Sequence, residues 1–248
     1  MIKAVRVFAR QQMPNYRRPA SFLIKESYPL PPYSSVIGLV HNMCEWKEYY
    51  PMRVSIQGGF ASTVSDYAIN YAFGAIPLDR AQLKVDSGGG RQAGIARMPR
   101  SYELLGDVTL LLHIIPDDPA LIADICGALN YPPVYPSLGR YEDLLQIEEA
   151  GVVELVESPE SFTAKYDAYV PLGSIDPLFS QNITGTIYRL GKVFQYDNGK
   201  AKLVAPDKKS MRVWKEVVMA RHICAGMELA SFPGILYDSQ NSDGVYPA

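Results

Sequence analysis

The chain has 248 residues, of which 48% are hydrophobic and 20% are charged, and its formal net charge is −2. These values are ordinary for a soluble globular protein and allow one large domain or two smaller ones. No apolar run approaches the roughly 20 residues that a membrane helix needs, so we expect no membrane partner.

The cysteines are few and scattered. Cys44, Cys126 and Cys224 form no CxxC pair and no disulfide ladder, which favours a reducing compartment. The strand-like pattern of residues 1–7 lacks the features of a signal peptide, so we predict a cytoplasmic protein. A structural zinc site usually needs four close ligands, so we expect no metal, and no motif calls for a cofactor.

Basic residues gather in two stretches. Residues 1–25 contain no acid, and a second basic stretch follows between residues 200 and 221. Acids gather between Glu142 and Glu160. Such segregation predicts one face that attracts phosphate, although two solvated basic surfaces would give the same pattern. The basic residues are Lys3, Arg6, Arg10, Arg17, Arg18 and Lys25, then Lys200, Lys202, Lys208, Lys209, Arg212, Lys215 and Arg221.

The first half of the chain begins with a strand and a helix. Residues 1–10 alternate between apolar and basic side chains, which predicts a strand, and residues 13–19 form a loop. Residues 28–32 hold too many prolines for a helix or a central strand. Ser34 or Ser35 then caps a helix that runs to Cys44. Residues 52–57 alternate again and predict a half-buried strand.

A long segment follows at residues 59–104. It lacks a helical period and contains Gly88-Gly89-Gly90 near its middle. A connection of this length is uncommon inside a compact domain unless it is functional. We therefore predict a projecting hairpin or a functional loop.

The second half repeats the first pattern. Residues 108–115 predict a strand, Asp118-Pro119 starts a helix, and residues 144–147 predict a fourth strand. The order β-α-β, then β-α-β, is the ferredoxin-like arrangement of RNA-recognition modules, so we predict an α+β fold. This domain covers residues 1–155.

The remainder, residues 156–248, is predicted to be β-rich. Residues 186–204, with Asp197-Asn198-Gly199 at the turn, predict a hairpin, and residues 213–221 predict another strand. The tail after Phe232 is polar and contains Gly and Pro, so we expect it to lie over the surface.

The segment from Tyr28 to Leu39 carries the strongest chemical signal. Its prolines extend the chain up to a helix N-terminus, where free N–H groups and the helix dipole favour an anion. Ser34 and Ser35 add hydroxyl donors, and Gly38 allows another chain to approach the helix closely. Upstream, Tyr16, Arg17 and Arg18 offer a stacking and phosphate-binding group. A capped core helix after a rigid linker would explain the same residues.

Two motifs resemble those of the fifth numbered family of CRISPR-associated proteins. Residues 15–19 followed by 28–38 resemble its N-terminal signature, and residues 137–144 resemble its second motif. In that second motif a basic residue is common where Tyr141 stands. The resemblance covers residues 1–150 well, and the C-terminal third is closest to the type I-B branch. We expect Glu142 and Asp143 to be solvated, with Glu142 pairing with Arg140.

The resemblance implies a repeat-associated (RAMP) ferredoxin-like domain in Cascade, an antiviral complex, where it caps the 5′ handle of the CRISPR RNA (crRNA). It implies that the insertion is a thumb hairpin that lies across the guide and contacts the backbone subunit. It also implies contact with the large subunit that recognises the PAM, and with target DNA only through the complex.

The residues implied for RNA binding come from both motifs and from the first strand and helix. They are Arg10, Tyr16, Arg17, Arg18, Ser34, Ser35, Gly38, Gly139 and Arg140. The residues implied for RNA and subunit contact in the thumb are Tyr71, Phe73, Arg80, Lys84, Arg91, Arg97 and Arg100.

One branch of this family cleaves pre-crRNA without metal, using Tyr, Lys and His. His41 lies near the position of that tyrosine, but the chain has no Lys-His dipeptide. His113 lies in an apolar strand, which is typical of a core histidine, and His222 ends a later strand. We therefore predict no enzymatic activity. A metal-independent pre-crRNA endoribonuclease and a stand-alone RNA-recognition module remain the alternatives.

Overall fold

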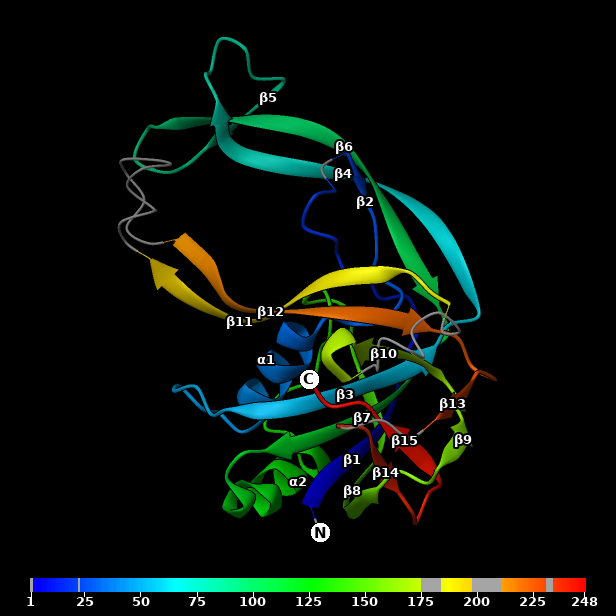
Figure 1. Ribbon diagram of the computed structural model, residues 1–248. Helices are drawn as coiled ribbons and strands as arrows, with labels where there is room; N and C mark the ends of the chain where they lie inside the picture. Colours follow the sequence, from blue (N-terminus) through cyan, green and yellow to red (C-terminus); the bar gives the residue numbers. More distant parts are fainter. Residues whose placement is uncertain (1, 22, 175–183, 198–210, 231–233) are drawn as a thin grey trace.

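The computed structural model describes residues 2–21, 23–174, 184–197, 211–230 and 234–248 (Figure 1). Its main feature is a nine-stranded antiparallel sheet in the order β11-β12-β10-β3-β7-β1-β8-β14-β15. Strand therefore dominates the α+β composition that was predicted. The strands are β1 (Ile2–Gln11), β3 (Met52–Gly59), β7 (Val108–Pro116), β8 (Gln146–Glu157), β10 (Asp167–Pro171), β11 (Ile187–Asp197), β12 (Met211–Ile223), β14 (Leu236–Asp238) and β15 (Asp243–Val245).

The two helices pack on the sheet that contains β1. Helix α1 (Tyr33–Met43) lies against β3 and β11, and α2 (Ile122–Asn130) lies against β1 and β8. The predicted alternation in β1 is confirmed, because Val5, Val7 and Ala9 are buried in the main core. The apolar stripe of α1 joins the same core, and its hydrophobic burial drives the packing.

Two local boundaries differ from the predicted ones, and a third confirms its prediction. The predicted cap at Ser34 or Ser35 is wrong, since Pro32 occupies the N-cap position and its carbonyl accepts from the Ser35 and Val36 amides. The predicted cap at Asp118 is confirmed, because its side chain accepts from the Ala120 amide at 3.0 Å. The fourth strand begins two residues later than predicted and runs to residue 157, because residues 137–145 are held in a loop by their own backbone hydrogen bonds.

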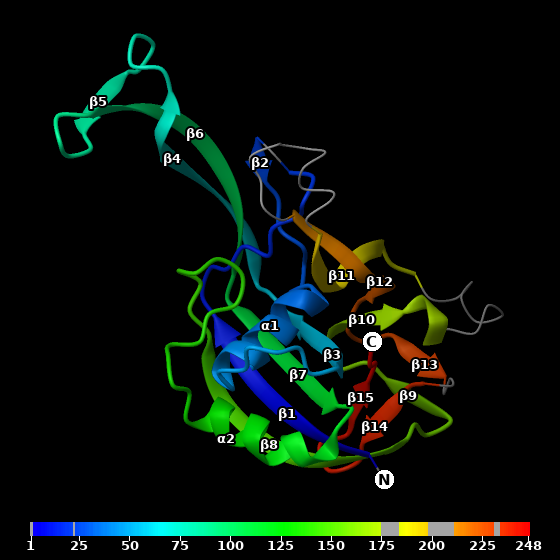
Figure 2. The same cartoon turned by 90° about the vertical axis from the view of Figure 1, so that its left-hand side faces the viewer.

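The insertion is a hairpin, as predicted. Strands β4 (Ser62–Ile76) and β6 (Gln92–Gly106) pair along their length, and β5 (Leu83–Asp86) pairs with β6. The short strand β2 (Ile24–Lys25) runs parallel to β6 near its base. Figures 1 and 2 show this hairpin standing away from the main sheet, and we call residues 62–106 the thumb.

The strands after residue 155 extend the main sheet at both edges. Strands β10 to β12 lie beside β3, and β14 with β15 lies beside β8. A separate pair joins β9 (Ser161–Thr163) to β13 (Glu228–Ala230). Within the predicted hairpin at residues 186–204, β11 pairs instead with β12, and residues 198–210 lie outside the described residues. The domain boundary at residue 155 stays a prediction.

The expectation that the tail after Phe232 covers the surface is wrong. The tail packs back onto β3, where the Gln57 side chain donates to the Gly244 carbonyl at 2.7 Å. Val54 and Ala248 exchange two backbone hydrogen bonds of 3.1 and 3.2 Å. The tail is buried because Ile235, Val245 and Tyr246 join apolar clusters and because its polar groups find polar partners in the sheet.

The polar partners of the tail form a row of charged side chains on one face of the sheet, which we call the charged row. Arg6 and His113 are register neighbours on β1 and β7. Arg6 Nε lies 3.2 Å from Asp243 Oδ2, and His113 Nε2 lies 3.7 Å from Asp238 Oδ2. Burial opposes the ionisation of Asp238, but His113 and hydrogen bonds from Asn241 outweigh it and lower its pKa to about 2. The buried charge of Asp238 stabilises the folded protein only while the groups that pair with it are present.

We expect Asp238→Asn to lower the free energy of unfolding by about 2–3 kcal/mol at pH 7. The pKa of Asp238 falls from 3.8 to about 2 on folding, so its contribution is present above pH 4 and is lost as the pH falls toward 2. The difference between the variant and the wild type should therefore shrink over that range. Urea unfolding followed by circular dichroism between pH 2 and pH 7 measures it.

The control is Asp79→Asn, since the Asp79 side chain is 76% exposed in the thumb. It should leave stability unchanged at every pH. A constant difference between Asp238→Asn and the wild type from pH 7 to pH 2 would contradict the account of the charged row.

Candidate nucleic-acid interface

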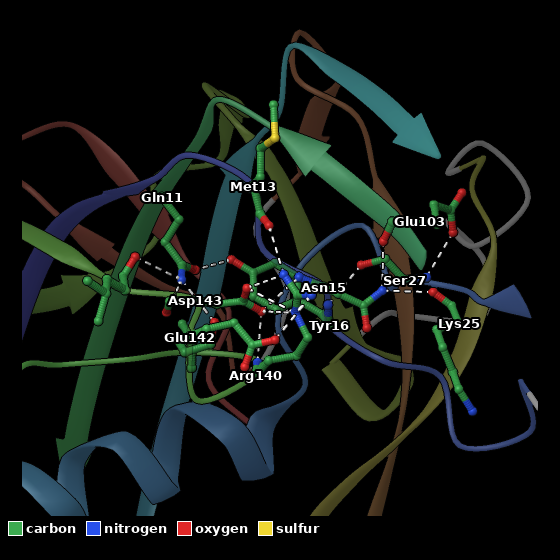
Figure 3. A network of polar contacts seen from close by, with 12 residues as sticks. Gln11, Met13, Asn15, Tyr16, Lys25, Ser27, Glu103, Arg140, Glu142 and Asp143 are labelled. Carbon is green, nitrogen blue, oxygen red and sulfur yellow. Dashed lines mark hydrogen bonds and ion pairs between the residues drawn. The ribbon is translucent and has the colours of Figure 1, made fainter. Parts of the chain in front are cut away.

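The two sequence motifs meet in space at one buried carboxylate. The Asp143 side chain, only 2% exposed, accepts from the backbone amide of Asn15 at 3.0 Å. It also accepts from the Arg140 amide at 2.8 Å and from Arg140 Nη2 at 2.6 Å. Figure 3 shows these contacts between the loop that follows β1 and the loop that precedes β8. Segments 128 positions apart in the sequence are thus joined by one side chain.

Gln11 reinforces the same junction from the end of β1. Its Nε2 donates to the carbonyls of Leu138 and Asp143, both at 2.9 Å. Its Oε1 accepts from the Tyr16 hydroxyl. Gln11 is 4% exposed, so these bonds satisfy a polar group that would otherwise be costly to bury.

Asn15 extends the junction to the base of the thumb. Its Nδ2 donates to the carbonyls of Lys25 at 2.8 Å and Glu103 at 2.7 Å. Glu103 Oε2 in turn accepts from the Ser27 amide at 2.8 Å. Strands β2 and β6 are therefore tied to the motif loops, which fixes the base of the thumb relative to the sheet. We call Gln11, Asn15, Tyr16, Ser27, Glu103, Arg140 and Asp143 the Asp143 network.

Gly139 is required by the path of the loop. Its φ is +110°, in the region that favours glycine. A Cβ at this position would lie 2.8 Å from Asp143 Oδ2 and 3.0 Å from the Asn15 carbonyl. The predicted role of Gly139 in RNA binding is thus accompanied by a structural one, which is to let the two motif loops touch.

The side chain of Arg140 binds groups of the protein itself. It pairs with Asp143 and, at 3.3 Å, with Glu142, and its guanidinium lies 5.5 Å from the centre of the Tyr102 ring. The hydrogen bond to Asp143 raises the pKa of Arg140. The predicted pairing with Glu142 is confirmed. The expectation that Asp143 is solvated is wrong, because the arginine and two backbone amides replace water around it.

The Tyr16-Arg17-Arg18 group is divided by the structure. Tyr16 is 1% exposed, so its ring has no free face for a base and the predicted stacking is wrong. Burial, followed by the charge of Asp143, raises the pKa of Tyr16 well above its ordinary value. Arg18 pairs with Glu26 at 3.3 Å and stacks on Tyr28. Arg17 is exposed and makes no ion pair among the described residues.

A cavity of about 960 Å³ opens beside the Asp143 network. Arg10 and Arg140 both line it, so the structure brings these two predicted residues together. Arg10 pairs with Glu148 at 3.1 Å but keeps 59% of its side chain exposed. Tyr135, 89% exposed, stands at the same cavity and could offer a ring to a base.

The predicted residues of α1 lie on a different element. Ser34 and Ser35 are half-buried in its first turn. Gly38 is exposed, and nothing lies within 4 Å of the place where a Cβ would stand. The close approach of another chain at Gly38 stays a prediction.

The thumb has two chemically different faces. The register pairs Tyr71 with Arg97 and Phe73 with Ile95, and side chains alternate between faces along each strand. Tyr67, Ile69, Tyr71, Phe73 and Arg97 therefore share one face, which we call the aromatic face. Tyr67 and Phe73 are each 69% exposed on it. Arg100 lies on the opposite face, and Arg80, Lys84 and Arg91 are exposed near the far end.

The three histidines lie on separate elements. His41 on α1 uses both ring nitrogens, since Nδ1 donates to the Ile37 carbonyl and Nε2 accepts from the Tyr50 amide. His113 on β7 is fully buried. Burial lowers the pKa of His222 on β12, and nearby Asp167 opposes this. No pair of them meets at one site in the described part of the chain.

Two clusters in the described residues could offer three metal ligands each. One is Asp167, His222 and Cys224, and the other is His113, Asp238 and Asp243. The carboxylates of the second cluster are already balanced by Arg6 and Lys165. A dication there would have to displace those charges.

A family model described as "CRISPR-associated protein (Cas_Cas5)" matches residues 5–216. The chain belongs to this Cas5 family. Both motifs that meet at Asp143 lie within the matched residues. No curated protein matches the sequence significantly. Within the described parts of this Cas5-family chain, no helix has the length and hydropathy needed to cross a membrane.

One solved structure is similar in fold. A chain of a "CRISPR RNA-guided surveillance complex" is 15% identical, with 91% of each chain covered and a TM-score of 0.52. A CRISPR protein from Archaeoglobus fulgidus is 10% identical over 98% of each chain, with a TM-score of 0.44.

We expect Asp143→Ala to lower the free energy of unfolding by about 2–4 kcal/mol, because it leaves Arg140 and two buried amides without their acceptor. The matched control is Glu142→Ala, whose carboxylate is 53% exposed and pairs with the same arginine. The control should change stability by less than about 0.5 kcal/mol. Urea unfolding measures both, and equal effects would contradict the central role of Asp143.

Proposed function

We propose that this Cas5-family protein is a non-catalytic, RNA-binding subunit of a type I CRISPR complex that caps the 5′ handle of crRNA. The observation that carries the proposal is the Asp143 network, which joins both family motifs to the base of a projecting thumb. Its neighbourhood supplies cations, an exposed tyrosine and a cavity, which suit a single strand. Similarity in fold to a chain of an RNA-guided surveillance complex supports the assignment.

We assign residues 1–155 to a ferredoxin-like RAMP domain. The strands β3-β7-β1-β8 are adjacent in that order, α1 follows β1, and α2 follows β7. Two βαβ halves that interleave in one antiparallel sheet give this order. The type I-B assignment rests on the resemblance of the C-terminal third alone.

The same proposal gives the partners. The aromatic face of the thumb suits the backbone subunit, because exposed aromatic side chains are enriched at protein interfaces. The large PAM-recognising subunit would contact the body of the protein, and target DNA would be met only through the complex. The expected compartment is the cytoplasm, where crRNA complexes act.

The nuclease alternative needs an acid–base group near a ribose 2′-OH. His41 is held by two hydrogen bonds, and His113 has no access to solvent. A general base must reach the proton that it removes. The arrangement of the histidines therefore favours binding without cleavage.

Two measurements test the proposal. The pure protein is incubated with labelled repeat RNA in EDTA, and we expect binding without a cut. It is also co-expressed with the other complex subunits and a guide, and we expect it to co-purify with the 5′ end of the crRNA. A single cut at the handle boundary would favour the nuclease, and recovery of RNA without any partner subunit would favour a stand-alone module.

We expect the double variant Tyr71→Ser, Phe73→Ser to fold normally but to lower recovery of the protein with the backbone subunit at least tenfold. Both side chains are more than half exposed, so their loss removes little from the folded core. The measurement is co-purification after co-expression, normalised to soluble protein.

The control is Tyr131→Ser, because Tyr131 is 86% exposed outside the thumb. It should leave recovery unchanged. Wild-type recovery of the double variant would show that the aromatic face is not the surface that meets the backbone subunit.

A further inference from the structure

Three cations from three chain segments share one face at the base of the thumb. Arg17 faces Ser27 across an isolated bridge, and Lys25 faces Tyr102 in the β2–β6 pair. Paired residues point to the same side of a sheet, and so do residues two apart on a strand. Arg17, Lys25 and Arg100 therefore lie together on the polar face of the thumb base, opposite the aromatic face.

Lys25 is the buried member of this group. It is 7% exposed, and its Nζ has only a long contact of 3.4 Å with the Ser21 carbonyl. Burial lowers the pKa of Lys25 from its ordinary value, and the charges of Arg17 and Arg100 lower it further. Holding like charges together in a partly desolvated place costs free energy, and an anion would recover it.

The acids near Lys25 in the described part of the chain make contacts other than an ion pair with it. Glu26 lies on the other side of β2 and pairs with Arg18. Glu103 lies on the other side of β6 and accepts from the Ser27 amide. Asp66, on β4 opposite Tyr102, accepts from the next backbone amide. No acid forms an ion pair with Lys25 among the described residues, whereas Arg6, Arg18 and Arg140 each have one.

We propose that Arg17, Lys25 and Arg100 form a phosphate-binding site, and that its occupant is the sugar–phosphate backbone of the guide RNA. This rests on the proposed function and specifies it. The RNA lies on the polar face of the thumb base, and the aromatic face is left for protein. An anion favours the charged form of Lys25, so the protein takes up a proton on binding when the pH is near the pKa of Lys25.

The first test compares Lys25→Gln with the wild type. Fluorescence anisotropy of a labelled handle RNA is measured from 50 to 300 mM salt, with the full chain. We expect an affinity loss of about five- to tenfold and a salt slope shallower by about 0.7, the value for one phosphate contact on a single strand. The matched control is Lys47→Gln, at an exposed lysine between α1 and β3, which should bind like the wild type.

The stability of the Lys25→Gln variant separates a role of Lys25 in ligand binding from a role in the fold. Without RNA, Lys25→Gln should be at least as stable as the wild type, because it removes a buried like charge. A variant that unfolds more easily and keeps the wild-type salt slope would overturn the site. If the wild type itself fails to bind RNA, the proposed function fails. If the wild type binds and Lys25→Gln binds equally, only this site fails.

The second test varies the pH and compares RNA with DNA. Lys25→Arg should restore affinity and should remove the proton uptake, since arginine stays charged throughout. Calorimetry in two buffers of different ionisation enthalpy measures that uptake between pH 7 and pH 9.5. Equal uptake by wild type and Lys25→Arg would contradict the site. Single-stranded DNA of the same sequence should bind more weakly than the handle RNA, and a preference for DNA would argue against the guide as occupant.

Discussion

The geometry of the candidate interface depends on how one buried carboxylate is satisfied. Asp143 has almost no contact with solvent, so its charge must be met by the Asn15 amide, the Arg140 amide and the Arg140 guanidinium. Meeting those donors forces two loops together, which leaves room only for glycine at position 139. Asn15 then binds the carbonyl of Glu103, so the orientation of the thumb follows from the same constraint.

A second polar network holds the opposite side of the sheet. Arg6 and His113 present charge and hydrogen-bonding capacity on a face that an apolar cover could not satisfy, and the carboxylates of the C-terminal tail meet them. The main core is apolar on the helix side, where Val5 and Val7 lie. The face opposite the helices therefore combines this polar network with a small apolar cluster that includes Ala4, Ile115 and Val245.

Sequence periodicity predicted the elements whose burial is apolar. The strands at residues 1–10 and 108–115 and both helices were predicted because local patterns report hydrophobic burial. The hairpin insertion was predicted from its length and its glycines. Asp143 and the C-terminal tail were missed for one shared reason, since a charged residue is expected in water unless its partner is known. Asn15, which binds Asp143, and Arg6, which binds Asp243, each lie more than 100 residues from their partner. The burial of Tyr16 depends on its packing in the main core, which the local pattern does not report.

Prediction from the sequence was limited at the candidate site as well. The motif residues were predicted from the sequence. In the structure, Tyr16, Gly139 and Arg140 have largely structural roles. Lys25 had no sequence feature beyond its charge that marked it as a site residue. What distinguishes Lys25 is that no acid pairs with it among the described residues, whereas Arg18 and Arg140 each have an acidic partner, and composition cannot report that. Because the Asp143 network fixes the thumb at its base, its two faces keep fixed directions. A strand bound at Lys25 and a subunit bound at the aromatic face would then lie on opposite sides of one hairpin, so each could bind without displacing the other.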